Sequence, residues 1–245
     1  RNAGASLTPA AGNYSLDRWN CQLSQSGKYT VQQNAGSVTP PTGFTNYLGV
    51  TSSSAYSIGA TDYFFIQQAI EGYNIADLGW GTANAKTVTL SFWVRSSLTG
   101  TFGGSLINAT AGYNYPFSYT ISAANTWEQK TVTIAGDTSA TWLTGNSTTN
   151  GGWGYLNFSL GCGSNFQTTN NTWSSGNYKA TSTSTSVVGT NGATFYITGV
   201  QLEKGSVATP FEYRQYGQEL ALCQRYYFKL QSTAAGCKFG SSFNY

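Results

Sequence analysis

The chain has 245 residues, which is enough for one large all-β domain or for a β-sandwich with a small appendage. Only 9% of its residues are charged, and the net charge of +3 comes from Lys and Arg residues scattered singly, so composition excludes the basic patches that bind nucleic acid or anionic membranes. No apolar run approaches the roughly 20 residues of a membrane-spanning helix, and the 15% aromatic content excludes intrinsic disorder.

Alternating or clustered apolar residues, interrupted by Gly, Asn, Ser or Pro, predict a series of β-strands. In chain order the clear ones are 17–23, 28–33, 63–70, 86–96, 115–121, 127–134, 153–160 and 193–202. Weaker segments bring the total to about ten, which is the number and spacing of strands in a sandwich. We therefore predict an all-β fold in which two antiparallel sheets pack face to face, and a jelly roll fits the pattern best.

The strongest strand signal, 86–96, has one apolar face and one mixed face. The apolar face consists of Val88, Leu90, Phe92 and Val94. The mixed face carries Trp93 and Arg95, which line a groove if this side of the sheet is concave. Between strands, the glycine pairs 103–104 and 151–152 are predicted hairpin turns, and 181–186 is a predicted exposed loop.

Composition changes after Pro210, so we divide the chain into a sandwich over 1–209 and a C-terminal extension over 210–245. Within the extension, spacings of three and four predict one or two helical turns over 215–227, and 228–245 resembles one or two strands without enough partners for a core. Such an extension is expected to pack on a neighbouring subunit or to begin a further domain. The predicted interface residues are Phe211, Tyr213, Tyr216, Leu220, Tyr226 and Tyr227.

Because the chain starts at Arg1 and contains no Met, we expect it to be part of a longer polypeptide.

The sequence offers little catalytic chemistry. It has no His, which excludes Ser-His-Asp, Cys-His and His-metal sites. Of its nine carboxylates, only Glu71 and Asp77 form a close pair in a loop-like setting, and a solvated loop or turn-capping role is favoured over a glycosidase pair. We therefore expect no enzyme activity, no cofactor and no metal.

The four cysteines are far apart in sequence and lack Cys-x-x-Cys spacing, which argues against zinc. They are Cys21, Cys162, Cys223 and Cys237. Two disulfides are compatible with this number, but buried free thiols are favoured because a domain of this size does not need disulfides for its core.

Aromatic residues in loops are the strongest candidates for a binding function. Sugars present C–H faces that stack on Trp and Tyr, while amide and guanidinium groups bond their hydroxyls. The predicted glycan-binding residues are Trp93, Arg95, Tyr113, Tyr115, Trp142, Trp153 and Trp173. The alternative for each is that it caps the core or packs between subunits, and only clustering on the surface would favour a site.

The segments 87–95, 127–134 and 193–202 resemble the carbohydrate-binding jelly rolls attached to xylanases and related enzymes, over about 17–204. This resemblance implies two sheets, a glycan groove on the concave side and often a structural calcium. The acidic pair that this family has in its last strand is replaced here by Thr198 and Gly199, which offer that ion no carboxylate.

A second resemblance covers the whole chain, through the run Asp17-Arg18-Trp19 and the segments 70–81, 199–213 and 219–227. These runs resemble a recurrent module of phage tail-fibre and other virion structural proteins. The resemblance implies a virion component, assembled as a homo-oligomer and often a trimer, with other virion proteins as partners and an outer surface suited to a host glycan. The alternatives are a module whose primary role is glycan binding, and a capsid decoration or neck protein without binding activity. Assembly in a reducing cytoplasm agrees with free thiols.

Overall fold

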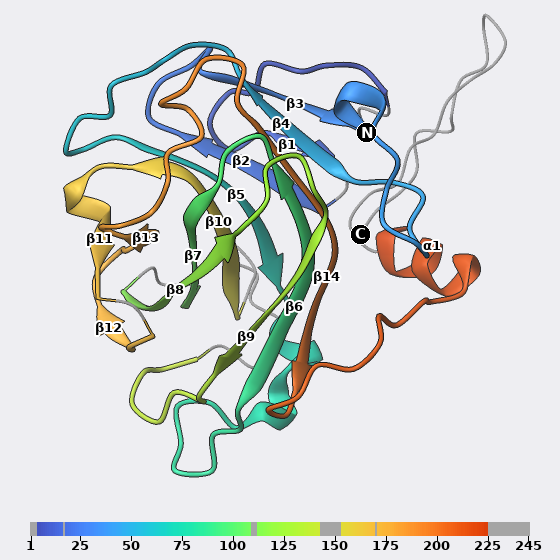
Figure 1. The fold of residues 1–245 in the computed structure, drawn as a ribbon. Helices are drawn as coiled ribbons and strands as arrows, with labels where there is room; N and C mark the ends of the chain where they lie inside the picture. The colour runs from blue at the N-terminus through green and yellow to red at the C-terminus, as the bar shows by residue number, and fades with distance from the viewer. Residues whose placement is uncertain (1–3, 17, 109–111, 143–152, 170, 225–245) are drawn as a thin grey trace, which may run out of the picture. The chain divides into compact units, whose positions relative to one another are not determined.

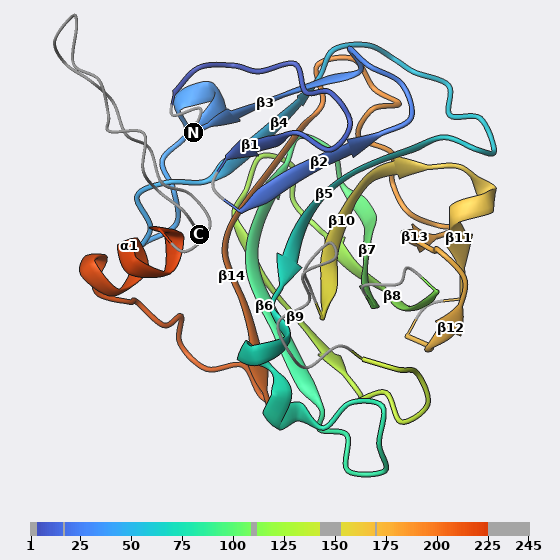
Figure 2. The same ribbon diagram turned by 180° about the vertical axis from the view of Figure 1, so that it is seen from behind.

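The computed structural model describes residues 4–16, 18–108, 112–142, 153–169 and 171–224 (Figure 1). The chain divides into two compact units, Arg1–Thr209 and Pro210–Tyr245. The first unit contains two main antiparallel sheets that pack as a sandwich, so the predicted all-β sandwich is confirmed (Figures 1 and 2).

The larger sheet has seven strands in the order β1-β2-β5-β10-β7-β8-β12. Its strands are β1 (Tyr14–Leu16), β2 (Trp19–Leu23), β5 (Tyr63–Ile70), β10 (Gly154–Cys162), β7 (Gly100–Asn108), β8 (Tyr113–Ile121) and β12 (Ser174–Ser175). The smaller sheet has five strands in the order β3-β4-β14-β6-β9. They are β3 (Tyr29–Gln33), β4 (Leu48–Ser52), β14 (Thr194–Lys204), β6 (Val88–Ser96) and β9 (Glu128–Ile134).

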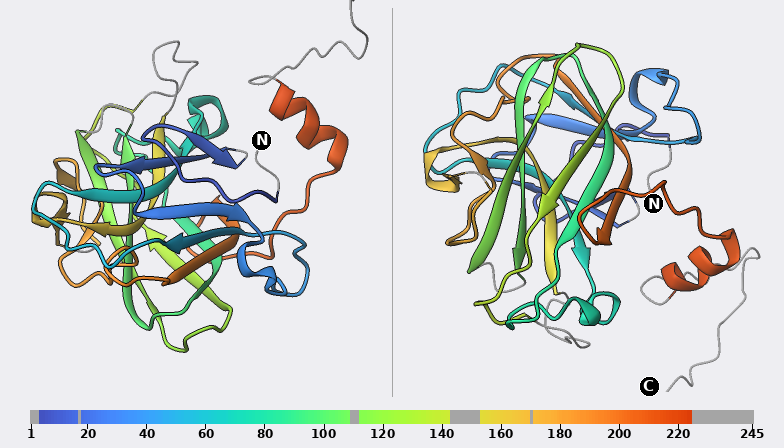
Figure 3. Two further views of the ribbon diagram at one scale, coloured as in Figure 1. Left: turned by 90° about the horizontal axis from the view of Figure 1, so that it is seen from above. Right: turned by 60° about the horizontal axis from the view of Figure 1, so that its bottom comes forward.

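Short elements complete the first unit. Strands β11 (Gln167–Thr168) and β13 (Ala180–Thr181) form a small parallel pair. The described loops contain the 3-10 helices η1 (Ala35–Ser37), η2 (Gly72–Asn74), η3 (Ala76–Leu78) and η4 (Ser164–Phe166). The long strands β6 and β14 run side by side through the five-stranded sheet (Figures 1 and 3).

The core lies between the two sheets and follows the period-2 pattern of the sequence. Val88, Leu90, Phe92 and Val94 are all at most 1% exposed, as the alternation along 86–96 predicts. Facing them are fully buried side chains of the larger sheet, including Phe64, Ile66, Leu106, Phe117 and Phe158. Burial of each such side chain contributes roughly 1.5–3 kcal/mol, so the alternation fixes which face of each strand turns inward.

Strands β4 and β7 were not among the clear sequence signals. Gly103 and Gly104 are in the interior of β7, and the predicted hairpin turn there is wrong. A Cβ on Gly104 would lie 2.5 Å from the Phe117 ring, so glycine is required here for close packing inside the sheet. The second predicted turn, 151–152, lies outside the described residues.

The second unit contains the helix α1 (Tyr216–Gln224), which agrees with the helical turns predicted over 215–227. Tyr213, Tyr216 and Leu220 are exposed, and Phe211 packs edge-on against Tyr213 with ring centroids 5.2 Å apart. Tyr226, Tyr227 and the strands predicted over 228–245 lie outside the described residues. None of the described helices is long and apolar enough to cross a membrane.

Candidate functional site

Three of the residues predicted to bind glycan are buried instead. Tyr115, Trp142 and Trp153 are 6%, 7% and 0% exposed, so the expectation that they are surface aromatics is wrong. Trp142 and Trp153 pack together with ring centroids 4.3 Å apart, and both contact Trp80. Their Gly- and Asn-rich flanks suggested exposed loops, but these rings belong to the core of the sandwich. Removing their apolar surface from water stabilises the folded state.

The Trp142 indole is also held by a buried carboxylate. Its Nε1–H donates to Asp137 Oδ2 at 2.7 Å, and the same oxygen accepts the backbone N–H of Ala140 at 2.9 Å. Burial alone would raise the pKa of Asp137, but the hydrogen bonds from Trp142, Ala140 and Ser139 outweigh it and lower the pKa. Asp137 is therefore a structural anion.

Tyr113 and Trp173 are partly exposed, but they cover one another. Their rings stack nearly parallel with centroids 5.8 Å apart, and the Trp173 Nε1–H donates to the carbonyl oxygen of Ala135 at 2.8 Å. This pair lies at the rim of the tryptophan cluster, because Trp173 also contacts Trp80.

Trp93 and Arg95 lie on the outer face of the five-stranded sheet, as predicted, and both are partly exposed. The Arg95 Nε–H donates to the carbonyl oxygen of Asn125 at 2.9 Å, and its guanidinium lies 5.5 Å from the centre of the Tyr196 ring. Arg95 is thus engaged within the protein. Trp93 is directly opposite Thr198 of β14 on one side and Gln129 of β9 on the other.

The loop between β3 and β4 covers part of the same outer face. Tyr47 and Tyr196 are 3% and 4% exposed, with ring centroids 5.0 Å apart, and Trp127 packs on both rings. The Tyr47 hydroxyl donates to the carbonyl oxygen of Ala35 and accepts the backbone N–H of Val38 at 3.0 Å. This small second core fixes the loop in place and with it the rim of a neighbouring cleft.

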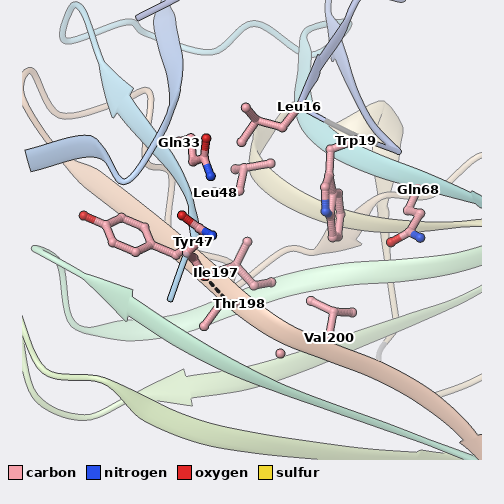
Figure 4. Close-up of a pocket in the computed structure, with 11 residues that line it drawn as sticks. Leu16, Trp19, Gln33, Tyr47, Leu48, Gln68, Ile197, Thr198 and Val200 are labelled. Carbon is pink, nitrogen blue, oxygen red and sulfur yellow. Dashed lines mark hydrogen bonds between the residues drawn. The ribbon is translucent and has the colours of Figure 1, made fainter. Parts of the chain in front are cut away.

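A cleft of about 460 Å³ opens beside β14 (Figure 4). Its lining residues come from both sheets and are Leu16, Trp19, Gln33, Asn46, Tyr47, Leu48, Gln68, Ile197, Thr198, Gly199 and Val200. None of these lining residues is charged.

The cleft exists because β4 is short. Strand β4 begins at Leu48, which pairs with Ile197, whereas β14 continues to Lys204. From Thr198 onward, the described residues provide no strand beside β14 on that side. The wall of the five-stranded sheet stops there, so inward-facing side chains of the opposite sheet can be reached from solvent.

A bulge in β14 shapes the rim. The register with β6 shifts between Thr198 and Gln201, and Gly199 has a φ of +59°, which favours glycine. The Phe44 ring lies where a Gly199 side chain would be, 2.5 Å from an ideal Cβ. The Thr198 hydroxyl donates to the carbonyl oxygen of Asn46 at 2.7 Å and ties the bulge to the β3–β4 loop.

Trp19 is the main aromatic group of the cleft. It is partly exposed, and its ring packs on Phe158 of the core with centroids 6.1 Å apart. Its cross-strand partner is Gln68 of β5, so an indole and an amide lie side by side. Figure 4 shows Leu16 and Val200 projecting toward the same space, while the Tyr47 ring points away from it. The arrangement combines a stacking surface with amide and hydroxyl groups at its margin.

Sequence reasoning did not identify Trp19 as a site residue. In the alternation of β2 it falls on the same face as Cys21 and Leu23, both buried, and this is the pattern of a core position. Only the gap beside β14 makes its ring reachable, and this gap depends on strand pairing that the local sequence does not encode. Gln68 was missed for the same reason.

The carboxylate pair considered for catalysis does not line this cleft. Asp77 accepts a hydrogen bond from Lys204 Nζ at 2.9 Å, and this contact is the main cause of its lowered pKa. Within the described part of the chain, no group of three or more Cys, Asp or Glu side chains could hold a metal ion. Cys21 and Cys162 are buried free thiols.

No protein-family model matches the sequence, and no curated protein matches it significantly. Among solved structures, similarity is found to the enzymatically active domain of tailspike protein 4 of bacteriophage CBA120, with 11% identity and a TM-score of 0.44, over 77% of this chain and 19% of that one. The chain thus spans about a fifth of the tailspike domain.

Two carbohydrate-binding modules are also similar. A CBM4 module matches with 14% identity and a TM-score of 0.40, over 77% of this chain and 96% of its own. The family 11 module of the cellulosomal cellulase Lic26A-Cel5E of Clostridium thermocellum matches with 12% identity and a TM-score of 0.38, over 83% and 96%.

Proposed function

We propose that this chain is a non-catalytic carbohydrate-binding module that attaches a phage particle to glycans on its host. The observation that supports glycan binding best is the cleft, in which the Trp19 indole lies among the amides of Gln33, Asn46 and Gln68 and none of the described lining residues is charged. The resemblance of the long sequence runs to virion appendage modules supports the particle context.

The chemistry of the cleft suits a neutral sugar. A pyranose ring stacks its C–H face on an indole, while amide groups accept from and donate to its hydroxyls. The cleft volume of about 460 Å³ lies within the range of about 300–1,000 Å³ that is usual for small-ligand sites. An uncharged lining gives no compensation for the desolvation of an acidic sugar, so neutral sugars are favoured.

The side chains around the cleft support binding without hydrolysis. Glycoside hydrolysis in its usual form needs two carboxyl groups on either side of the bond to be cleaved. The described residues that line the cleft include no carboxylate, and Asp77 is committed to Lys204.

The particle context includes assembly as a homo-oligomer, most simply a trimer, through the C-terminal extension. In the helix α1, Tyr216 is 81% exposed and Leu220 and Leu222 are also exposed, and apolar side chains exposed together in this way favour an interface. Light scattering of the full chain tests this part separately, and a stable monomer with an ordered extension would contradict it.

A glycan array tests the binding proposal, with wild type, Gln68→Leu and Gln67→Leu compared at equal concentration. Gln68 lines the cleft, whereas Gln67, its neighbour on β5, faces the other side of the sheet and bonds Asn20. We expect neutral glycans to bind wild type and Gln67→Leu, and to bind Gln68→Leu at least several-fold more weakly, since an unpaired sugar hydroxyl costs about 1 kcal/mol or more. An array without hits, or equal binding by all three proteins, refutes the proposal.

A further inference from the structure

We infer that the binding site extends out of the cleft, across Thr198, to the indole of Trp93 on the outer face of the five-stranded sheet. The ligand is then a neutral oligosaccharide of several units rather than a single terminal sugar. This inference rests on the proposed function and adds a second aromatic subsite to it.

Thr198 connects the two surfaces. It lines the cleft, and it is also the residue of β14 directly opposite Trp93 of β6. Cross-strand partners have Cβ atoms about 4.5–5.5 Å apart, so the Trp93 side chain starts within about one sugar ring of the cleft wall. No element of the sandwich is inserted between the two positions, because they are neighbours in the ladder.

The crossing point is rigid. Thr198 is held by its hydrogen bond to the carbonyl oxygen of Asn46, and the Phe44 ring fills the space beside Gly199. A ligand leaving the cleft therefore meets a surface whose parts are fixed against one another, in place of a flexible side chain that it would have to order. Such preorganisation lowers the entropic cost of binding.

Trp93 has the setting of a stacking surface. Its indole is partly exposed, and within the described residues no ring packs on it and no group accepts a hydrogen bond from its Nε1–H. Gln129 of β9 is exposed on its far side. Along β6 on the same face, Ser91 is 4% exposed and Arg95 donates to the carbonyl oxygen of Asn125. The row across the strands from Thr198 through Trp93 to Gln129 is therefore an aromatic ring between a hydroxyl and an amide, which repeats the chemistry of the cleft.

Titration calorimetry of the full chain with a size-fractionated series of neutral oligosaccharides, one to six units long and of the type that the array selects, tests the inference. For wild type, we expect affinity to rise with length. Trp93→Ala should leave the affinity for one or two units unchanged and lower that for the longest chains by on the order of tenfold, as expected for one lost stacking contact. Gln68→Leu should weaken binding at every length.

Thr131→Ala is the matched control, because Thr131 is exposed on the same outer face of β9 but away from the row that joins Trp93 to the cleft. It should bind all lengths like wild type. If Trp93→Ala lowers the thermal stability of the sandwich, Gln129→Ala at the exposed end of the same row replaces it, with a smaller loss that is again confined to long chains.

Four results overturn the inference. Wild-type affinity that does not depend on chain length, or unchanged binding of every length by Trp93→Ala and Gln129→Ala, removes the second subsite and leaves the proposed function standing. Loss of binding at all lengths in a folded Trp93→Ala moves the primary site to the outer face. An array on which no neutral glycan binds refutes the proposed function, and it refutes the extended site as well.

Discussion

Lys179 is a buried cation in a protein with few charges, and its replacement by Met should stabilise the fold. The side chain is 6% exposed, its Nζ lies 4.7 Å from the centre of the Phe65 ring, and no described carboxylate forms an ion pair with it. Burial lowers its pKa from 10.5 to about 8, although the nearby Cys162 acts in the opposite direction. This change corresponds to about 3 kcal/mol of destabilisation of the charged form at neutral pH.

The Phe65 contact offsets part of that cost, by about 1 kcal/mol. We therefore expect Lys179→Met to raise the free energy of unfolding by about 1–2 kcal/mol at pH 7. The folded-state pKa is below the unfolded one, so between about pH 8 and pH 10 the unfolded chain binds more protons and the stability contributed by Lys179 rises with pH. The advantage of the variant should shrink over this range.

Chemical denaturation of both proteins at pH 7, 8, 9 and 10 measures this difference. Burial raises the pKa of Cys21 and Cys162, so both titrate differently in the two states. Cys21 contributes equally to wild type and variant and cancels in the comparison. Lys179 lowers the pKa of Cys162, so this pKa is higher in the variant, and the variant therefore loses more stability as pH rises, which adds to the expected shrinkage of its advantage. Lys204→Met, at an exposed ion pair, is the control for the loss of a lysine charge and should leave the free energy of unfolding at pH 7 nearly unchanged. A less stable Lys179→Met at pH 7, or an advantage that is constant up to pH 10, refutes the reasoning.

Three further predictions concern the sandwich. Gly104→Ala brings a methyl group against the Phe117 ring and should lower the free energy of unfolding by about 1–3 kcal/mol, and an unchanged thermal midpoint would contradict it. Asp137 has a lowered pKa, so its stabilising effect is present above about pH 4 and is lost as pH falls through its folded pKa. In denaturant titrations, Asp137→Asn should therefore lose less stability than wild type between pH 5 and pH 2.5. Cys21 and Cys162 should resist iodoacetamide in the native protein and react in denaturant, as read by peptide mass spectrometry, and fast native labelling would argue against their burial.

Much of the fold can be predicted from local sequence, because each strand with one buried face leaves an alternating pattern. Residues 86–96 have this pattern, and β6 follows it. Residues 63–70 carry clustered apolar residues instead, and β5 has these same bounds. Strand β7 is not predicted because Gly103 and Gly104 interrupt the alternating pattern. In the structure, neighbouring atoms occupy the space where side chains at these positions would lie. Close packing against glycine is a tertiary property.

The site is less predictable than the fold. Loop composition suggested that Trp142 and Trp153 are exposed, but it does not show whether an aromatic side chain turns into the core, as both of these do. Trp19 shows the opposite case. Its strand pattern is that of a core residue, but its ring can be reached from solvent because β4 begins only at Leu48. Trp93, on the outer face of a long strand, is the one predicted aromatic residue that strand alternation alone places correctly.

A crystal structure of the full chain with the best neutral oligosaccharide from the array tests the central claim most directly. We predict a sugar ring stacked on the Trp19 indole, with the Gln68 amide within hydrogen-bond distance of a ring hydroxyl and the chain leaving the cleft past Thr198. A sugar bound on the outer face of the seven-stranded sheet, with the Trp19 cleft unoccupied, would contradict the account.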